Sequence, residues 1–328
     1  MYQSFYRLHA KPFQLRPDPD FFFGSKGHKR AMAYLEYGLS QGEGFIVITG
    51  EVGAGKTTLV RNLFKRLSTD NIVAAQIVNT RLNSDDTLRM VVAAFGLVAD
   101  DTSKALLLAR LEQFLKQCDR QGQRALLVVD EAQNLSPQAV EELRMLSNFQ
   151  TANKSLLQTF LLGQPEFRNI LHSEDMLQLR QRVIATYHLG PMDAEETRAY
   201  IEHRLKTAGW KGDPSFDAQA YALIHQHSGG IPRRINTLCD RLMLMGYLEE
   251  LHHFGSKETQ EVMADIDQEF SAPLSQNVVQ EPLKAGALPF SMEALSNLED
   301  IEERLSKMER SVTSVLDVLK RLLMSSRK

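Results

Sequence analysis

The chain has 328 residues, of which 43% are hydrophobic and 24% are charged, and its formal net charge is −3. These proportions are ordinary for a globular protein, and the length predicts about two domains with additional segments. A net charge slightly below zero argues against a surface devoted to nucleic acid, although a local basic patch is compatible with it.

The two cysteines, Cys118 and Cys239, form no CxxC pair, which predicts two buried thiols in a reducing compartment. The N-terminus lacks the long apolar segment of a signal peptide, and no apolar run approaches the length of about 18 residues that a membrane span requires. We therefore expect a cytoplasmic protein without a transmembrane helix.

Residues 1–28 form an arm rich in aromatic residues and prolines, and the prolines at 12, 17 and 19 exclude a long helix. We predict an irregular arm that packs its phenylalanines on an apolar surface. These are Phe5, Phe13, Phe21, Phe22 and Phe23. A helical periodicity over 27–40 follows, so residues 1–40 are interpreted as an N-terminal arm and helix.

Residues 41–192 alternate short apolar runs with helical patterns, and we interpret them as one α/β core. The runs typical of strands lie at 45–49, 72–78, 125–129, 156–162 and 183–189. The helical patterns lie at 56–67, 84–96, 103–120, 136–148 and 166–172. Strands separated by helices need crossover connections, which predicts a parallel sheet covered on both faces. The pattern does not give the order of the strands in the sheet.

Residues 193–270 show helical patterns without an intervening strand-like run, which predicts a small helical domain. Its first helix begins at Asp193, and Glu196 three residues later is typical of a capped helix start. Further helices are predicted at 215–227, 232–249 and 257–269.

The end of the sequence changes character twice. Residues 271–290 contain three prolines and little periodicity, which indicates a linker. From Leu298 to Leu322 apolar residues recur at alternating spacings of three and four, which predicts a coiled coil over 291–325. The alternative is a single amphipathic helix that docks on the globular body. The pattern does not say whether a partner would be a second copy or another protein.

The motif GEVGAGKTT follows the first apolar run and matches the full phosphate-binding loop pattern. The glycines let the backbone curl so that amide hydrogens point into one hollow, and the following helix adds its positive end. A lysine in this pattern supplies charge for the β- and γ-phosphates, and the next hydroxyl is suited to a magnesium ion. The predicted nucleotide-binding residues here are Gly50, Glu51, Val52, Gly53, Ala54, Gly55, Lys56, Thr57 and Thr58.

Two adjacent acids, Asp130 and Glu131, come directly after the apolar run at 125–129. The Asp130 carboxylate is suited to hold magnesium together with Thr57, and the Glu131 carboxylate is suited to act as a general base on water. A solvated strand end is the alternative for both, and the complete phosphate loop argues against it. Glu131 favours hydrolysis over mere retention of the nucleotide.

The sequence resembles the AAA+ ATPases over about residues 1–270, most closely those of the general secretion pathway protein A type. Within that type it is similar to the subgroup encoded with exosortase/PEP-CTERM exopolysaccharide systems. The segments that carry the resemblance include "FIVITGEVGAGKTTLVR", "LLVVDEAQNLSPQAVEELRMLSNFQ", "LLGQPEFR" and "SGGIPRRINTLCDRLM". The resemblance implies a P-loop NTPase αβα sandwich with a C-terminal helical lid, here followed by the coiled-coil tail. Proteins of this type often continue into a transmembrane segment and a cell-wall-binding region, and we do not carry a cell-wall role over to this sequence.

The resemblance also implies roles for residues outside the phosphate loop. Gln164 corresponds to a polar sensor that orients the attacking water. An arginine finger that reaches into a neighbouring subunit corresponds to Arg180 or Arg182, and the sequence does not choose between them. The sensor of the lid corresponds to Arg233, with Arg234 as the alternative. His28 is a weaker candidate for framing the adenine, with a surface histidine as its alternative.

Three functions are compatible with these features. The leading hypothesis is a Mg2+-dependent ATPase that forms homo-oligomers, such as a ring, and supports assembly or export of exopolysaccharide or PEP-CTERM surface proteins. Its coiled coil would bind a protein partner, such as an inner-membrane component, and place the protein at the periphery of that membrane. The second is a DNA-associated ATPase, like transposition regulators and helicase loaders, which the net charge does not favour. The third is a scaffold that binds a nucleotide without hydrolysing it.

Overall fold

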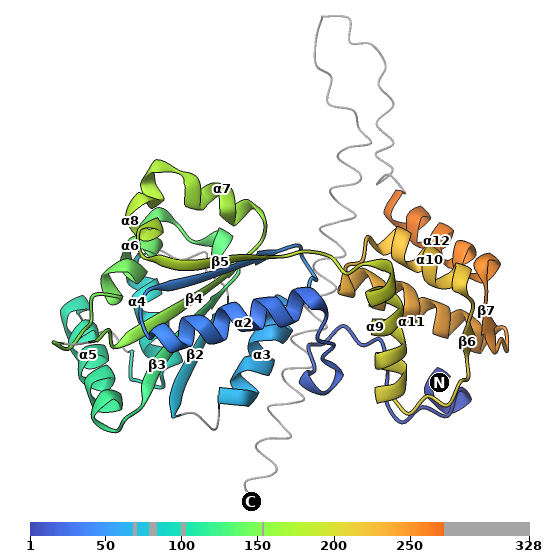
Figure 1. The fold of residues 1–328 in the computed structure, drawn as a ribbon, viewed down its shortest axis with the longest axis horizontal. Coiled ribbons are helices and arrows are strands. Elements are labelled where there is room, and N and C mark those ends of the chain that lie inside the picture. The colour runs from blue at the N-terminus through green and yellow to red at the C-terminus, as the bar shows by residue number, and fades with distance from the viewer. Residues whose placement is uncertain (68–70, 79–83, 100–102, 153, 272–328) are drawn as a thin grey trace, which may run out of the picture. The chain divides into compact units, whose positions relative to one another are not determined.

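The structure is a computed structural model that describes residues 1–67, 71–78, 84–99, 103–152 and 154–271. Nearly all of the predicted linker, and the whole predicted coiled coil at 291–325, lie outside the described residues. The elements below belong to one compact unit, Met1–Ala272 (Figure 1).

A five-stranded parallel sheet forms the centre of the core, as predicted (Figure 1). Its strands are β1 (Phe45–Gly50), β2 (Ile72–Val78), β3 (Arg124–Asp130), β4 (Leu157–Gly163) and β5 (Val183–Leu189). Their order in the sheet is β2-β3-β4-β1-β5, and every neighbouring pair is parallel. The carboxyl ends of β1, β3 and β4 therefore meet at one edge of the sheet.

Helices cover both faces of this sheet, which confirms the predicted αβα arrangement. They are α2 (Lys26–Gln41), α3 (Lys56–Leu67), α4 (Ser84–Ala94), α5 (Lys104–Arg120), α6 (Pro137–Leu146), α7 (Glu166–His172) and the short α8 (Leu177–Arg180). Alternate side chains of the central strands enter different cores: Val47 and Leu127 pack with α4, α5 and α6, whereas Ile48 and Leu126 pack with α2 and α3. Alternation across a pleated strand produces this division.

The helical lid contains α9 (Ala194–Thr207), α10 (Ala218–Ser228), α11 (Pro232–Leu248) and α12 (Ser256–Ser271). The capping box predicted at its start is present, since Asp193 accepts a hydrogen bond from the Glu196 amide and the Glu196 side chain accepts from the Asp193 amide. The expectation that the lid holds no strand is wrong. β6 (Ser215–Phe216) and β7 (His253–Phe254) pair in parallel, and α10 consequently begins later than predicted. Two-residue strands show no alternation that a sequence pattern could reveal.

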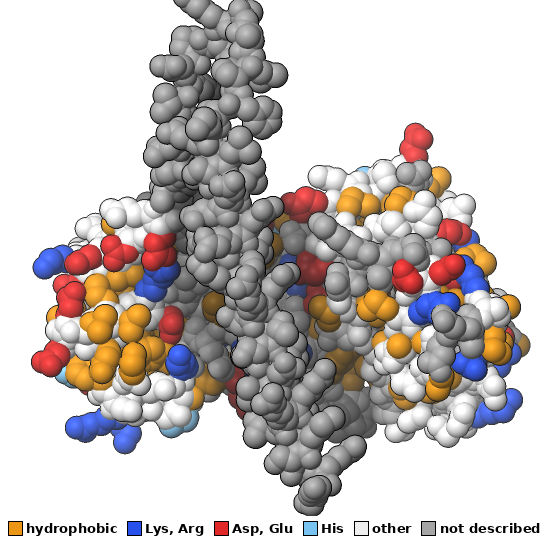
Figure 2. Space-filling model, turned by 180° about the vertical axis from the view of Figure 1, so that it is seen from behind, with side chains coloured by type: hydrophobic (Ala, Val, Ile, Leu, Met, Phe, Trp, Pro, Cys, Tyr) orange, Lys and Arg blue, Asp and Glu red, His pale blue; other side chains and the backbone are white. Residues whose placement is uncertain are grey.

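The N-terminal arm packs on the lid and the core. It contains the short helix α1 (Tyr2–Phe5) and a 3-10 turn at Pro19–Phe21, and is otherwise irregular as its prolines predict. Phe13 and Phe21 are buried in the apolar core of the lid, 1% and 7% exposed. The side chains of the arm and the lid therefore share one core. On the face seen in Figure 2, hydrophobic side chains gather on part of the lobe at the left of the picture, with charged side chains around them.

Both cysteines are free and buried, as predicted. In the part of the chain that the structure describes, no helix combines the length and the apolar character that crossing a bilayer would require.

Candidate nucleotide-binding site

The phosphate-loop motif forms a tight turn between β1 and α3, at the carboxyl edge of the sheet. Gly53 and Gly55 have φ angles of +83° and +98°, a region that side chains rarely adopt, so these two glycines make the curl possible. Gly50 acts differently from the prediction. It is the last residue of β1, and a Cβ there would overlap the backbone carbonyl of Leu189 on β5.

His28 is buried against the phosphate loop and supports it through a contact with Ala54. It is 5% exposed, its Nε2 lies 3.1 Å from the carbonyl oxygen of Ala54, and its Nδ1 lies 2.7 Å from the Ser25 hydroxyl. A neutral ring satisfies both contacts, because Nε2–H donates to the carbonyl and Nδ1 accepts from the hydroxyl. The ring does not line the cavity that opens beside the phosphate loop, so a role in framing adenine has no support here. The alternative of a surface histidine is wrong, because the side chain is buried.

The burial of His28 predicts a pH dependence of stability. Desolvation lowers the pKa of His28 although the Ala54 carbonyl opposes this, so the unfolded chain binds the extra proton more readily than the folded chain. The stabilisation is fully present above the ordinary histidine pKa of about 6.5 and is lost as the pH falls below it. We expect the free energy of unfolding to fall less between pH 7.5 and pH 5.5 (~2 units) for His28→Gln than for the wild type. Urea unfolding at both pH values would measure the free energy of unfolding, with His253→Gln on the lid surface as the control. The same change of this free energy with pH in all three proteins would contradict the prediction.

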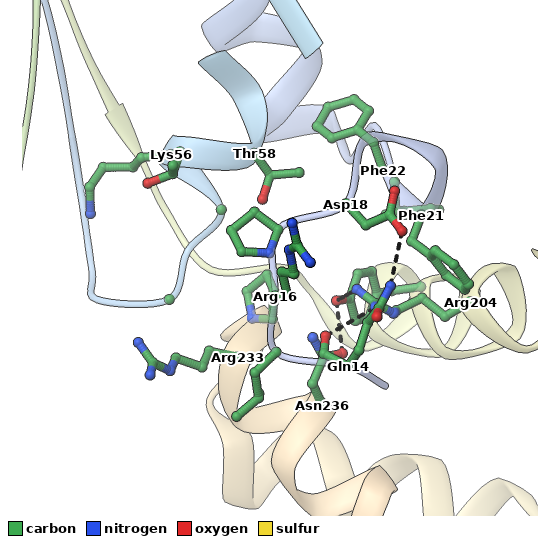
Figure 3. A pocket seen from close by; sticks show the side chains of 18 of the residues that line it. Gln14, Arg16, Asp18, Phe21, Phe22, Lys56, Thr58, Arg204, Arg233 and Asn236 are labelled. Atoms are coloured by element: carbon green, nitrogen blue, oxygen red, sulfur yellow. Dashed lines mark hydrogen bonds between the residues drawn. The ribbon is translucent and has the colours of Figure 1, made fainter. Parts of the chain in front are cut away.

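Lys56, the first residue of α3, is 6% exposed and directed toward its own loop. Its Nζ donates to the carbonyl oxygens of Gly50 at 2.6 Å and Glu51 at 3.0 Å. Burial lowers the pKa of Lys56, and the negative charges of Glu131 and Asp130 oppose that effect. Figure 3 shows the ammonium group turned away from the centre of the cavity. A phosphate would offer this buried cation the anionic partner that the loop carbonyls do not.

Asp130 and Thr57 meet at the base of the phosphate loop. The Thr57 hydroxyl donates to Oδ2 of Asp130 at 2.8 Å, and the amide of Glu131 donates to Oδ1 at 3.0 Å. Burial raises the pKa of Asp130, and these two hydrogen bonds act against the rise. Mg2+ is held in nucleotide sites by one or two protein oxygens together with water and phosphate oxygens. The Thr57 hydroxyl and the Asp130 carboxylate are therefore suited to hold this ion.

Glu131 lies in the left-handed region, with φ 57° and ψ 42°, which is uncommon for a residue other than glycine. Its Oε2 accepts hydrogen bonds from Gln133 at 2.5 Å and from Gln164 at 3.1 Å. The Oε1 atom of Gln133 also accepts a hydrogen bond from the backbone amide of Gln164 at 2.9 Å. The Gln133 side chain therefore links the ends of β3 and β4. Burial raises the pKa of Glu131, but these hydrogen bonds and Lys56 outweigh it, and the net pKa lies below the ordinary value. The carboxylate is therefore ionised at neutral pH.

A cavity of about 370 Å³ opens beside the phosphate loop, with Glu131 on its wall. The loop contributes Val52, Gly53, Gly55, Lys56, Thr57 and Thr58, whereas Gly50, Glu51 and Ala54 do not line it. The N-terminal arm forms a second wall between Gln14 and Phe23, and the lid forms a third (Figure 3). The sequence did not predict that the arm lines this cavity.

The lid joins the site through the start of α11. The amide of Arg233 donates to the carbonyl oxygen of Gly53 at 3.2 Å, and a Cβ on Gly53 would overlap the Arg233 side chain. Arg233 lines the cavity, as the sensor role requires, whereas Arg234 does not. The lid and the phosphate loop are therefore in direct contact.

The two candidates for an arginine finger lie away from this cavity. Arg182 precedes β5 at the amino edge of the sheet, about 20 Å along the strand from the phosphate loop, and donates to the Ser147 hydroxyl at 2.6 Å. Arg180 ends α8 and donates to the Leu171 carbonyl at 3.2 Å. Neither side chain lines the cavity, so the role of an arginine finger that reaches into a neighbouring subunit stays a prediction.

The fold and the site together define an AAA-type domain with the P-loop NTPase fold. Residues 39–171 match the family model described as "AAA domain". Over 253 residues the chain is 40% identical to General secretion pathway protein A of Aeromonas hydrophila, a match that covers 77% of this chain and 46% of that protein. The chain thus spans about half the length of this curated relative. The resemblance to that type is confirmed, and the narrower resemblance to the exosortase subgroup stays a prediction.

Solved structures with the same fold agree with this assignment. The ORC2 protein of Aeropyrum pernix, in ADPNP and ADP complexes, has a TM-score of 0.61 and 16% identity, with 78% of this chain and 71% of that chain covered. Drosophila ORC bound to DNA has a TM-score of 0.58 and 16% identity, with 81% and 66% covered. Cdc6p of Pyrobaculum aerophilum has a TM-score of 0.57 and 14% identity, with 80% and 71% covered. At these identities the likeness shows the fold alone.

Proposed function

We propose that this protein is a Mg2+-dependent ATPase whose turnover requires assembly of subunits. The observation that carries the proposal is the position of Glu131, whose ionised carboxylate lies on the wall of the cavity that the phosphate loop also lines. The loop amides and Lys56 would hold the phosphates, while Thr57 and Asp130 would hold Mg2+, which withdraws charge from the phosphate oxygens. Gln164 would orient the attacking water.

In this proposal Glu131 accepts a proton as the water oxygen bonds to the γ-phosphorus. The bond from that phosphorus to the β–γ bridging oxygen breaks, which gives ADP and inorganic phosphate. A hydrogen-bonded carboxylate at the edge of the sheet is suited to this step, because it stays ionised and its orientation is fixed by two amides.

Phosphate release by the purified full chain tests the proposal. We expect turnover with ATP and Mg2+, none with EDTA, and a turnover per subunit that rises with protein concentration. Tight ATP binding with zero turnover at every concentration would contradict it and support the nucleotide-bound scaffold. Stimulation of turnover by DNA, with DNA affinity that falls steeply as salt rises, would instead favour the DNA-associated ATPase.

A mixing experiment tests for an arginine finger. Arg180→Ala or Arg182→Ala leaves the phosphate loop intact, whereas Lys56→Ala removes nucleotide binding and leaves both arginines intact. If one of the two acts on the neighbouring site, its alanine variant should be inactive alone and partly active after mixing with Lys56→Ala. An inactive variant that no mixture rescues would contradict a role between subunits.

The proposed cellular role is support of exopolysaccharide or PEP-CTERM surface assembly and secretion. The relative from a secretion pathway supports the link to secretion, whereas the link to exopolysaccharide or PEP-CTERM systems rests on the sequence resemblance alone. In this role the protein is cytoplasmic and peripheral at the inner membrane, where residues 291–325 bind a protein partner. A pull-down with the full chain and with a chain that ends at residue 271 would identify proteins that depend on this segment.

A further inference from the structure

The N-terminal arm is fixed beside the cavity from two sides. From the lid, Arg204 donates to the carbonyl oxygens of Pro12 and, at 3.2 Å, of Gln14. From the core, Arg61 on α3 donates to the carbonyl oxygen of Pro17 at 2.8 Å. The arm is therefore held on both sides of position 16.

Arg204, which holds the arm from the lid, is buried and belongs to a hydrogen-bond network. Arg204 is 7% exposed, and its guanidinium lies 5.1 Å from the centre of the Phe21 ring. It also donates to the Tyr200 hydroxyl at 3.0 Å, and that hydroxyl donates to Asn236 on α11 at 2.9 Å. Because the network connects the arm to two lid helices, the backbone around residue 16 has a defined position relative to the site.

Arg16 projects from this fixed segment into the nucleotide cavity. It lines the cavity together with Thr58 of the phosphate loop, and Figure 3 shows its side chain directed from the arm toward Thr58. Within the described ranges, the Arg16 side chain makes no hydrogen bond, ion pair or ring contact. Asp18, the acid nearest in sequence, is already engaged, since its two oxygens accept from Gln14 Nε2 and from the Asp20 amide, each at 3.0 Å.

We propose that Arg16 binds the phosphate chain of the nucleotide from the side of the arm, within the same subunit. The inference rests on the proposed function, because it requires the cavity to hold a nucleoside triphosphate. A guanidinium offers a planar fork of donors that matches phosphate oxygens, and no carboxylate of the described residues is paired with it, although Asp18 and Glu131 also line the cavity. The phosphates would then contact cations from three segments of the chain: Lys56 of the loop, Arg233 of the lid and Arg16 of the arm.

Calorimetric titration of the full chain with two probes, ATP and inorganic tripolyphosphate, tests this assignment. We expect Arg16→Gln to weaken both probes at least about tenfold at low salt, with a smaller difference at high salt because the lost contact is between charges. Lys11→Gln is the matched control, since Lys11 is an exposed cation of the same arm that does not line the cavity. It should bind both probes as the wild type does.

Several outcomes would overturn the assignment. Unchanged affinity of Arg16→Gln for both probes would show that Arg16 does not contact the ligand, and weakened ATP with unchanged tripolyphosphate would place the contact at the base or ribose. An equal loss of affinity in Lys11→Gln would show that any cation on the arm produces the effect through its charge, without contact with the phosphates. If the wild type itself bound neither probe, the proposed function would be contradicted as well. If the wild type bound both probes and Arg16→Gln had no effect, only the role of Arg16 would be contradicted.

Discussion

Replacing Lys56 by alanine is expected to lower the affinity for ATP by at least about 100-fold, which corresponds to about 2.8 kcal/mol. The reason is the environment of this ammonium group, which is buried under the phosphate loop, where the hydrogen-bond partners seen among the described residues are two carbonyl oxygens. Anionic phosphates would be far better partners for it. Calorimetry with ATP, and with ADP for comparison, would measure the loss.

The fold should survive the substitution of Lys56. Alanine removes two hydrogen bonds to the loop, but it also removes a buried charge whose desolvation opposes folding. We therefore expect the melting temperature without nucleotide to change little, and the increase that ATP produces in the wild type to disappear. Lys65→Ala is the control, because Lys65 is an exposed lysine on the same helix, at its far end. A Lys56→Ala protein that still gained stability from ATP would contradict the assignment of the loop.

Much of the core could be predicted because its strands are apolar runs that end in polar motifs. β1 ends at the phosphate loop and β3 ends at Asp130, and the ends of parallel strands lie at one edge. The sequence pattern alone therefore brings the loop and the two acids together. It does not give the strand order, because each crossover can return to either side of the previous strand, and the order decides that Gln164 after β4 reaches Glu131.

The parts of the site that the sequence did not predict depend on tertiary contacts. Arg204 lies on a helix among other charged residues, where a solvated face is the usual interpretation, and its burial depends on carbonyl groups of the arm about 190 residues away. Gln133 has a weak local signal, since it lies two residues after Glu131 at a strand end. Its bridging contact to Gln164 depends on the neighbouring strand. The prolines of the arm predict irregular backbone, but not the cavity that this backbone lines.

Replacing Glu131 by glutamine is expected to leave ATP binding within about threefold of the wild type and to reduce turnover by at least about 100-fold, the lower bound for loss of a general base. The two side chains have nearly the same shape. The amide oxygen of glutamine can still accept from Gln133 and Gln164, so the loop and the cavity should keep their geometry. What is lost is the basicity of a carboxylate, and with it the ability to take a proton from water. Titration with ATP and a steady-state phosphate assay on the same preparation would separate binding from turnover.

The pH profile distinguishes a base from a purely structural acid. The pKa of Glu131 lies below its ordinary value, so the carboxylate is ionised through the neutral range, and loss of its proton-accepting form should reduce turnover only as the pH falls into the acidic range. Glu131→Gln should lack the part of this acid limb that protonation of Glu131 causes, whereas Glu141→Gln, which changes an exposed acid on α6, should keep both the rate and the profile of the wild type. Turnover by Glu131→Gln at the wild-type rate would show that another group activates the water. The site would then still hydrolyse ATP, and the assignment of Glu131 as the general base would be wrong.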